Sequence, residues 1–204
     1  MLGSQGEREL QRLYNTENRA LSFYNNQMLT SLNPMMQQFI AEQEMVFVST
    51  SDQAGNCDST FRAGERGFVR VMNEETLIYP EYRGNGVFAS LGNMHENPHI
   101  GLLFIDFFKH HIGLHVNGKA FVMTHDELAS QPFIEDSLAE KLQAEENGRA
   151  ERWVVVQIEE AYIHCSKHIP HFDKREKEID WGTDDEVKKG GDFFKVRERQ
   201  RVGR

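Results

Sequence analysis

The sequence predicts a mainly β fold, an antiparallel meander or small barrel with short helices on its faces. Three observations support this prediction. Short runs of β-forming residues begin at Met45 and recur at turn-sized spacing. Longer helical patterns are found mainly in residues 7–43 and after Thr124. Strands never alternate regularly with long helices, which makes a doubly wound nucleotide-binding fold a poor match.

The composition is that of one globular domain in the cytoplasm. With 204 residues, 39% of them hydrophobic and 27% charged, the chain can bury a core of ordinary size. No apolar run approaches the ~20 residues that span a bilayer. Residues 1–11 lack the basic start and apolar centre of a secretory signal. Cys57 and Cys165 are too few for a disulfide framework, so we expect a cytoplasmic protein.

The net charge of −9 is carried by the body of the chain. Residues 173–204 contain ten Lys/Arg and nine Asp/Glu, which leaves thirteen basic and twenty-three acidic residues in the remainder. A duplex nucleic acid requires a basic face, so this balance argues against such a partner. A few local arginines in an acidic body fit a small phosphorylated ligand better.

The first forty residues are expected to be packing helices. Apolar residues recur at helical spacing through residues 7–43, and Asn33-Pro34 supplies an N-cap followed by proline at the first helical position. The pattern changes at Met45. Strands are predicted for residues 45–50, 57–62, 68–72 and 77–79, separated by turns rich in Gly, Asn, Asp and Ser.

The second half of the chain continues in the same way. Residues 87–96 suit a short helix that Asn97-Pro98 stops, and strands are predicted for residues 99–106 and 112–123. Thr124 and Glu127 form a capping box that opens a helical region to about residue 146. A long last strand covers residues 153–165. The charged residues that follow are expected to be an extended arm or a partly disordered tail.

The segment Tyr82-Arg83-Gly84-Asn85-Gly86 lies directly before a predicted helix. An arginine fork, backbone N–H groups exposed by glycine and a helix N-terminus together favour a bound phosphate. Ser90 on the first helical turn adds a hydroxyl. The alternative is an ordinary connection from a hairpin to a helix. Arg62 and Arg70 are further donors for a nucleotide, or else solvated surface charges.

The spaced motifs form a series: Asp58-x-Ser-x-x-Arg62-x-Gly64, Gly67-Phe-Val-Arg70-Val, Tyr79-Pro-Glu-Tyr-Arg-Gly-Asn85, Leu91-Gly-Asn93, Asn97-Pro98-x-x-Gly101-Leu-Leu-Phe104 and Val116-Asn-Gly118-Lys-Ala120. This series resembles the pyridoxamine 5′-phosphate oxidase-like family of flavin-binding split barrels. The resemblance covers roughly residues 45–122 and, more weakly, residues 153–170. Several motifs in the right order make it far more specific than a single glycine loop.

The resemblance implies a six-stranded antiparallel split β-barrel that forms a homodimer and binds FMN at the subunit interface. It divides the chain into packing helices (1–44), the barrel (45–172) and a charged C-terminal arm or tail (173–204). The phosphate is expected at the loop of residues 79–86, the isoalloxazine ring along residues 59–68, and His115 or Asn117 from the other subunit. The implied FMN-binding residues are Ser59, Arg62, Phe68, Arg70, Tyr79, Pro80, Tyr82, Arg83, Gly84, Asn85, Gly86, Ser90, His115, Asn117 and Lys167.

The sequence also departs from the family pattern. The vitamin-processing oxidases carry an arginine-lysine pair on the helix after the fourth strand, where this chain has Ala89-Ser90. Arg83 is expected to take over part of that role. The C-terminal substrate-binding pattern of those enzymes is not found either. We therefore do not expect the oxidation of pyridoxamine phosphate itself.

Histidines gather near the end of the last predicted strand, at His164, His168 and His171, beside Cys165. Imidazole and thiolate are zinc ligands, but this spacing matches no standard zinc pattern. We expect no metal and a role for this segment in lining the flavin cleft.

A flavin supplies the redox chemistry itself, so no catalytic residue is assigned. The main hypothesis is an FMN-dependent oxidoreductase that acts on a small substrate. The alternatives are a protein that binds, stores or senses a flavin or haem without turnover, and a deazaflavin-dependent reductase.

Overall fold

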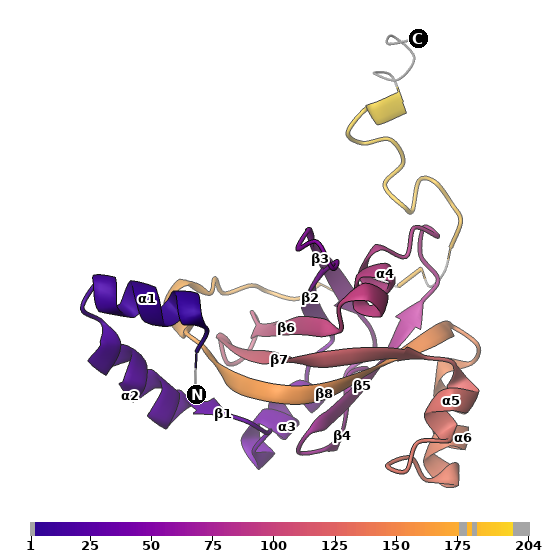
Figure 1. Ribbon diagram of the computed structural model, residues 1–204. Helices are drawn as coiled ribbons and strands as arrows, with labels where there is room; N and C mark the ends of the chain where they lie inside the picture. Colours follow the sequence, from indigo (N-terminus) through magenta and orange to yellow (C-terminus); the bar gives the residue numbers. More distant parts are fainter. Residues whose placement is uncertain (1–2, 176–178, 181–182, 198–204) are drawn as a thin grey trace.

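A computed structural model describes residues 3–175, 179–180 and 183–197, and within them eight strands form one antiparallel sheet (Figure 1). The strands are β1 (Met28–Leu29), β2 (Met45–Ser51), β3 (Cys57–Ala63), β4 (Arg70–Asn73), β5 (Thr76–Tyr82), β6 (His99–Asp106), β7 (Ile112–Met123) and β8 (Ala150–His164). Their order is β3-β2-β6-β7-β8-β5-β4, and β1 pairs with a further stretch of β8. The predicted mainly antiparallel β fold of the split-barrel class, with short helices, is confirmed. The strand count differs from the expected six.

Strand β8 joins the two halves of the sheet. It pairs with β7 from Gly113↔His164 to Met123↔Trp153, and with β5 along the register Thr76↔Gln157 to Glu81↔Arg152. Its consecutive apolar residues are buried because both faces of this strand are covered. Val154 and Val156 belong to the core inside the barrel, whereas Trp153 and Val155 pack in a second cluster with α5 and α6.

Short helices lie around this sheet (Figure 1). They are α1 (Gln5–Leu13), α2 (Glu17–Gln27), α3 (Pro34–Ala41), α4 (Ala89–Glu96), α5 (His125–Ala129) and α6 (Asp136–Glu146). The predicted caps of α3 and α5 are confirmed. The Asn33 side chain accepts from the Met36 N–H, and Thr124 and Glu127 form a reciprocal capping box. Helices α1 and α2 project away from the barrel and bury no residue.

The prediction of a strand over residues 68–72 is wrong at its start. The strand begins at Arg70, because Gly67 adopts a left-handed conformation with φ of 76° and the Phe68 N–H donates to the Glu65 carbonyl. Phe68 then turns inward, 3% exposed, against Gly64. A Cβ on Gly64 would lie 2.5 Å from the Phe68 side chain, so the turn requires glycine there.

Two predicted helical regions are interrupted. Between α5 and α6, Pro132 has no N–H to donate and disfavours helical backbone at the residue before it. The N-terminal region of residues 7–43 breaks at Asn15, which is left-handed with φ of 53°, and again at β1. Strand β1 is two residues long, too short for a recognisable sequence pattern.

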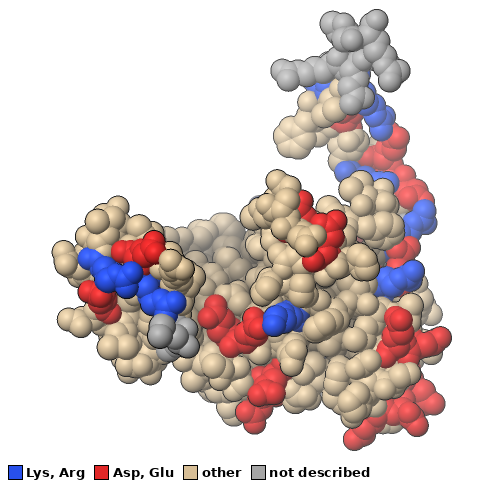
Figure 2. All heavy atoms as spheres, viewed as in Figure 1, with Lys and Arg blue, Asp and Glu red and all other residues tan. Residues whose placement is uncertain are grey.

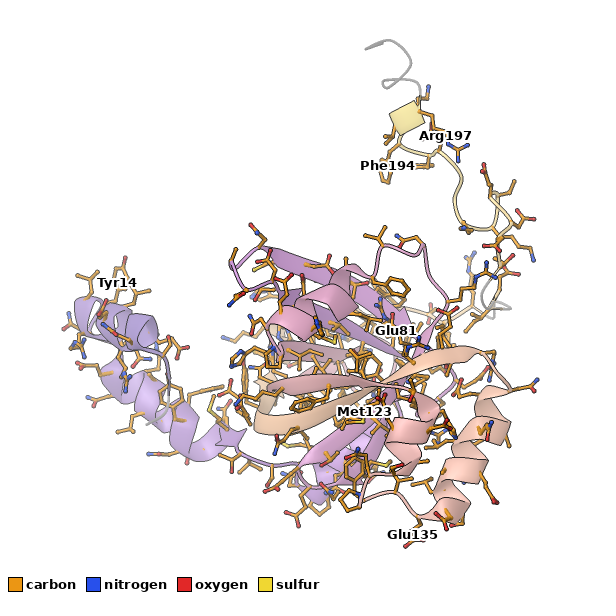
Figure 3. All side chains as sticks on the ribbon, turned by 45° about the vertical axis from the view of Figure 1, so that its right-hand side comes forward. Tyr14, Glu81, Met123, Glu135, Phe194 and Arg197 are labelled. Atoms are coloured by element: carbon orange, nitrogen blue, oxygen red, sulfur yellow. The ribbon has the colours of Figure 1, made fainter. Side chains whose placement is uncertain are left out.

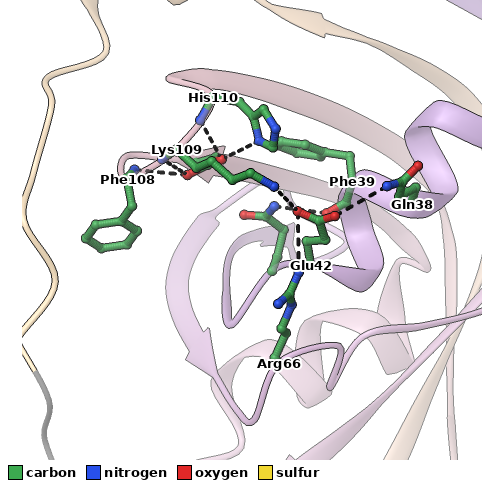
Figure 4. Close-up of polar contacts among 9 residues, drawn as sticks. Gln38, Phe39, Glu42, Arg66, Phe108, Lys109 and His110 are labelled. Atoms are coloured by element: carbon green, nitrogen blue, oxygen red, sulfur yellow. Dashed lines mark hydrogen bonds and ion pairs between the residues drawn. The ribbon is translucent and has the colours of Figure 1, made fainter.

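The turn between β6 and β7 is organised by Asp106, which is 8% exposed (Figure 4). Its carboxylate accepts backbone N–H bonds from Phe108, Lys109 and His110 at 2.8–2.9 Å, and its Oδ2 lies 2.8 Å from the His110 ring. Burial alone raises the pKa of an aspartate. Here the hydrogen bonds outweigh it and lower the pKa of Asp106 to about 2.

Replacing Asp106 with asparagine is expected to reduce the free energy of unfolding by about 2 kcal/mol at pH 7, from a shift of about two pKa units. Because the folded-state pKa is depressed, the carboxylate's contribution is complete above pH ~4 and is lost as the pH falls through about 2. Urea unfolding of wild type and Asp106→Asn at pH 7, 4 and 2 tests this. A stability difference that did not shrink below pH 4 would contradict the assignment.

The chain after β8 is first fixed to the barrel and then leaves it. The Phe172 N–H donates to the Phe107 carbonyl at 2.9 Å, and the two rings stack 5.1 Å apart. Residues 183–197 rise from the body beyond the end of β5 and carry both acidic and basic side chains (Figures 1 and 2). The proposed tail also includes residues 176–178, 181–182 and 198–204, which lie outside the described residues. The division of the chain into three parts therefore stays a prediction.

No helix in the described residues is both long and apolar enough to cross a membrane.

Candidate functional site

A cleft of about 750 Å³ lies between β3, the end of β5, the loop that follows it and the start of α4. Eight of the residues predicted to bind FMN line this cleft: Ser59, Arg62, Tyr82, Arg83, Gly84, Asn85, Gly86 and Ser90. They come from two separate stretches of the sequence, residues 59–62 and 82–90. The fold therefore brings together the glycine loop, the first arginine and the helix N-terminus.

The loop between β5 and α4 is shaped by Asn85 and Gly86. The Asn85 side chain accepts from the Val87 N–H at 3.0 Å, and Gly86 is left-handed with φ of 77°. Phe88 takes the N-cap position in a left-handed conformation and provides no side-chain cap to α4. The first turn of the helix thus lacks the usual capping oxygen. Neither Gly84 nor Gly86 has an atom within 4 Å of a Cβ position, so the loop leaves open space for a ligand.

Arg62 lines the cleft with its guanidinium already engaged. Its Nε and Nη2 donate to the two carboxylate oxygens of Glu81 at 2.9 and 2.7 Å, and Nη1 donates to Thr60 at 2.6 Å. The two side chains of the ion pair are only 21% and 13% exposed. The bidentate pair joins β3 to β5 and neutralises the charge of Arg62, so this arginine attracts an anion less than a free one.

Arg83 is more exposed and contacts the C-terminal segment. Its Nη2 donates to Oδ2 of Asp184 at 2.7 Å, and Lys189 Nζ lies 3.8 Å from the other oxygen of the same carboxylate. Both Asp184 and Lys189 line the cleft. A segment that follows the barrel by some twenty residues thus contributes to the wall of the cleft.

Helix α4 is held against the barrel by polar side chains. The Ser90 hydroxyl, 4% exposed, donates to Asp58 at 2.9 Å, and Asn93 donates to Thr50 at 3.0 Å. The position of the helix N-terminus is therefore fixed relative to β2 and β3. Ser90 therefore lines the wall of the cleft, and its hydroxyl proton is already donated to Asp58.

Several predicted residues do not reach the cleft. Phe68, Tyr79 and Pro80 are buried, and the Tyr79 hydroxyl has no hydrogen-bond partner. Burial raises the pKa of Tyr79. Arg70 pairs with Glu145 on α6 instead. Strand β5 points alternate residues to opposite faces, so its motif cannot place every member on one side.

The remaining three predicted residues lie elsewhere. Asn117 lines a second groove of about 710 Å³, which shares Asp58 and Ser59 with the cleft. His115 stacks on Tyr162, and its Nε2 lies 2.9 Å from Nδ1 of His164. Burial and the nearby His164 lower the pKa of His115. Lys167 lies on the short 3₁₀ turn η1 (Ser166–His168) and is exposed.

Sequence reasoning missed six charged residues of the cleft: Asp58, Glu81, Glu151, Arg152, Asp184 and Lys189. Together with Arg62 and Arg83 they give four acidic and four basic side chains in the described lining. The cleft is therefore balanced in charge and built from ion pairs. Glu81 lies between two motif residues and could have been found as the partner of an arginine. No local pattern marks Asp184 or Lys189.

Among the described residues, no three or more His, Cys, Asp or Glu side chains are arranged to hold a metal ion. Two of the histidines near the end of β8 instead contact histidines of other parts of the chain. His164 contacts His115, and His171 stacks on His111 with ring centres 3.4 Å apart.

Comparison with known proteins gives a family match over most of the barrel. The family model described as pyridoxamine 5′-phosphate oxidase matches residues 32–165. No match is found among curated protein sequences. Solved structures similar to this chain include HupZ of Group A Streptococcus, with 18% identity, coverage of 70% of this chain and 99% of that one, and a TM-score of 0.49.

Two further solved structures are similar with lower TM-scores. HutZ of Vibrio cholerae, described as a heme storage protein, has 16% identity to this chain and a TM-score of 0.43, and the match covers 63% of this chain and 89% of HutZ. A Clostridium acetobutylicum protein related to general stress protein 26 has 12% identity to this chain and a TM-score of 0.40. That match covers 62% of this chain and 83% of the Clostridium protein. At these values none of the three structures bears on what this chain binds.

Proposed function

This chain belongs to the pyridoxamine 5′-phosphate oxidase family, and on that premise we propose that it is an FMN-binding protein, a flavin-dependent oxidoreductase for a small substrate. The observation that carries the proposal is the cleft in which Arg83, the open glycine loop and the uncapped N-terminus of α4 converge. These are the groups that suit a phosphate monoester.

The residues present fit the phosphate end of FMN. Gly84 and Gly86 leave space for close approach to the backbone, and Phe88 leaves the helix N–H groups without a side-chain acceptor. Three donors of the cleft, Arg62, Arg83 and Ser90, already hold carboxylates. Arg83 is the most exposed of the three, at 57%, so it is the donor we assign to the phosphate. Arg62 is assigned to hold β3 and β5 together at the wall of the site.

The isoalloxazine ring is proposed to lie along β3 toward the groove of Asn117. The cleft and this groove meet at Asp58 and Ser59, so one extended ligand could contact both. Bound flavin would supply the redox chemistry, and the chain's part is to bind, orient and shield it.

We further propose a cytoplasmic homodimer with the flavin at the subunit interface. Phe61 on the edge strand β3 is 51% exposed beside the cleft, and we assign this side chain to the contact with the second copy. His115 lies away from the cleft of its own chain, in keeping with a role toward the partner's site. Cys57 and Cys165 are unpaired and exposed, which suits a reducing compartment.

The absorption spectrum of the purified chain tests the proposal. We expect a yellow protein that, on denaturation, releases FMN in about one equivalent per chain. Riboflavin, which lacks the phosphate, should bind more weakly than FMN. Colourless protein that takes up no added FMN would overturn the proposal.

A second candidate is a flavin-binding, storage or sensing protein without turnover. It is favoured by the described lining of the cleft, in which no histidine or cysteine is found and the charged groups are largely paired with one another. Anaerobic addition of NADH or NADPH separates the two functions. Bleaching of the flavin with recovery in air supports the oxidoreductase, and an unchanged spectrum supports the binding protein.

A further inference from the structure

The C-terminal segment brings a carboxylate and an ammonium group into the proposed phosphate site. Asp184 lies with one oxygen 2.7 Å from Arg83 Nη2 and the other 3.8 Å from Lys189 Nζ. All three side chains line the cleft and are 48–66% exposed. One anionic group is thus held between two cations, one from the β5–α4 loop and one from the C-terminal segment.

We propose that Arg83 and Lys189 together form the subsite for a phosphate monoester dianion, and that Asp184 is its internal occupant, which the ligand displaces. The proposal rests on the proposed function for the identity of the ligand, FMN. It assigns Lys189 as the second basic residue of the site, in place of the basic pair that is missing at Ala89-Ser90.

The local structure of the segment supports this assignment. The Asp185 side chain accepts from the N–H groups of Val187 and Lys188, and the Lys189 N–H donates to the Asp185 carbonyl at 3.0 Å. This turn holds Lys189 on the same side as Asp184. Lys188, the neighbouring lysine, pairs with Asp180 instead and does not line the cleft. The segment therefore directs one lysine of the two toward Arg83.

The exposure of the three groups makes displacement feasible. An ion pair this exposed contributes little, because water and salt screen it and two side chains are immobilised. A phosphate monoester carries up to two charges near pH 7 and three strong acceptor oxygens, so it can bind Arg83 and Lys189 at once. The contact between Arg83 and Asp184 thus prepares the positions of the cations without blocking the site.

Calorimetric titration with FMN, riboflavin and methyl phosphate tests the inference on the full chain. For Asp184→Asn we expect FMN to bind about 2–5-fold more tightly, and for Lys189→Gln about 3–10-fold more weakly. Binding of riboflavin should not change in either variant. Glu186→Gln and Lys188→Gln make the same charge changes outside the cleft, since Glu186 pairs with Arg197, and should leave FMN affinity unchanged.

The outcomes separate the inference from the proposed function. Suppose that the wild type binds FMN, and that Asp184→Asn and Lys189→Gln leave FMN affinity unchanged, as their controls do. The inference is then wrong, and the proposed function stands. If FMN does not bind but methyl phosphate binds more tightly to Asp184→Asn and more weakly to Lys189→Gln, the subsite is real and the flavin assignment fails. If neither ligand binds to any variant, both are wrong.

Discussion

Replacing Arg83 with alanine is expected to weaken FMN binding at least tenfold. A hydrogen bond to a charged group contributes ~1.5–3 kcal/mol, which corresponds to a tenfold to hundredfold change in the dissociation constant. Arg62 cannot compensate, since its guanidinium is held in a bidentate pair by Glu81. Fluorescence quenching of FMN on titration with protein measures the effect.

The matched control is Arg66→Ala. Arg66 is an exposed arginine that pairs with Glu42 at 3.4 Å and does not line the cleft, so its loss should not change FMN affinity (Figure 4). Riboflavin affinity should be the same in wild type and Arg83→Ala, because the missing contact is to the phosphate. Equal FMN affinity of wild type and Arg83→Ala would remove Arg83 from the site.

Replacing Gly118 with alanine is expected to lower the free energy of unfolding by about 2–4 kcal/mol. Gly118 lies where the register of β7 and β8 shifts, and a Cβ there would come 2.0 Å from the Gln157 carbonyl oxygen. The obstacle is backbone of the neighbouring strand, which cannot rotate away as a side chain could. The added methyl must therefore push apart the two strands that share the longest ladder of the sheet.

Urea unfolding monitored by the fluorescence of buried Trp153 measures this change. Gly92→Ala adds the same methyl group in the middle of α4, where no atom lies within 4 Å of the new position. That control should be neutral or stabilising by up to about 1 kcal/mol, because alanine favours a helix more than glycine does. A Gly118→Ala variant as stable as the Gly92→Ala control would contradict the close approach of the two strands.

Much of the barrel could be predicted because its elements carry local signals. Strands β6 and β7 have the predicted bounds, residues 99–106 and 112–123. Their ends are marked by Asn97-Pro98 on one side and the capping box at Thr124 on the other. Signals of this kind depend only on residues that are neighbours in the sequence. They can therefore be recognised in a single sequence before its fold is known.

The charges of the cleft could not be predicted in the same way. The pairing of Arg62 with Glu81 depends on β3 and β5 facing each other across the cleft, although the two strands are far apart in the sheet order. The pairing of Arg83 with Asp184 depends on residues about a hundred positions apart. In Figure 3, Glu81 lies in the body of the molecule, and Phe194 and Arg197 lie at the far end of the C-terminal segment to which Asp184 belongs. The tertiary structure decides which charged residues pair, whereas the composition gives only the number of charged residues.

The position of β8 in the sheet has a consequence for synthesis on the ribosome. Until Ala150–His164 emerges, the chain can assemble β3-β2-β6-β7 and, separately, the β4–β5 hairpin, but no strand pairing connects these two pieces and β1 has no partner strand. An isolated hairpin is marginally stable, and unpaired strand edges invite association with other nascent chains. The sheet therefore cannot close during synthesis until β8 has been made. Until then, the unpaired strands leave the barrel open to misassembly.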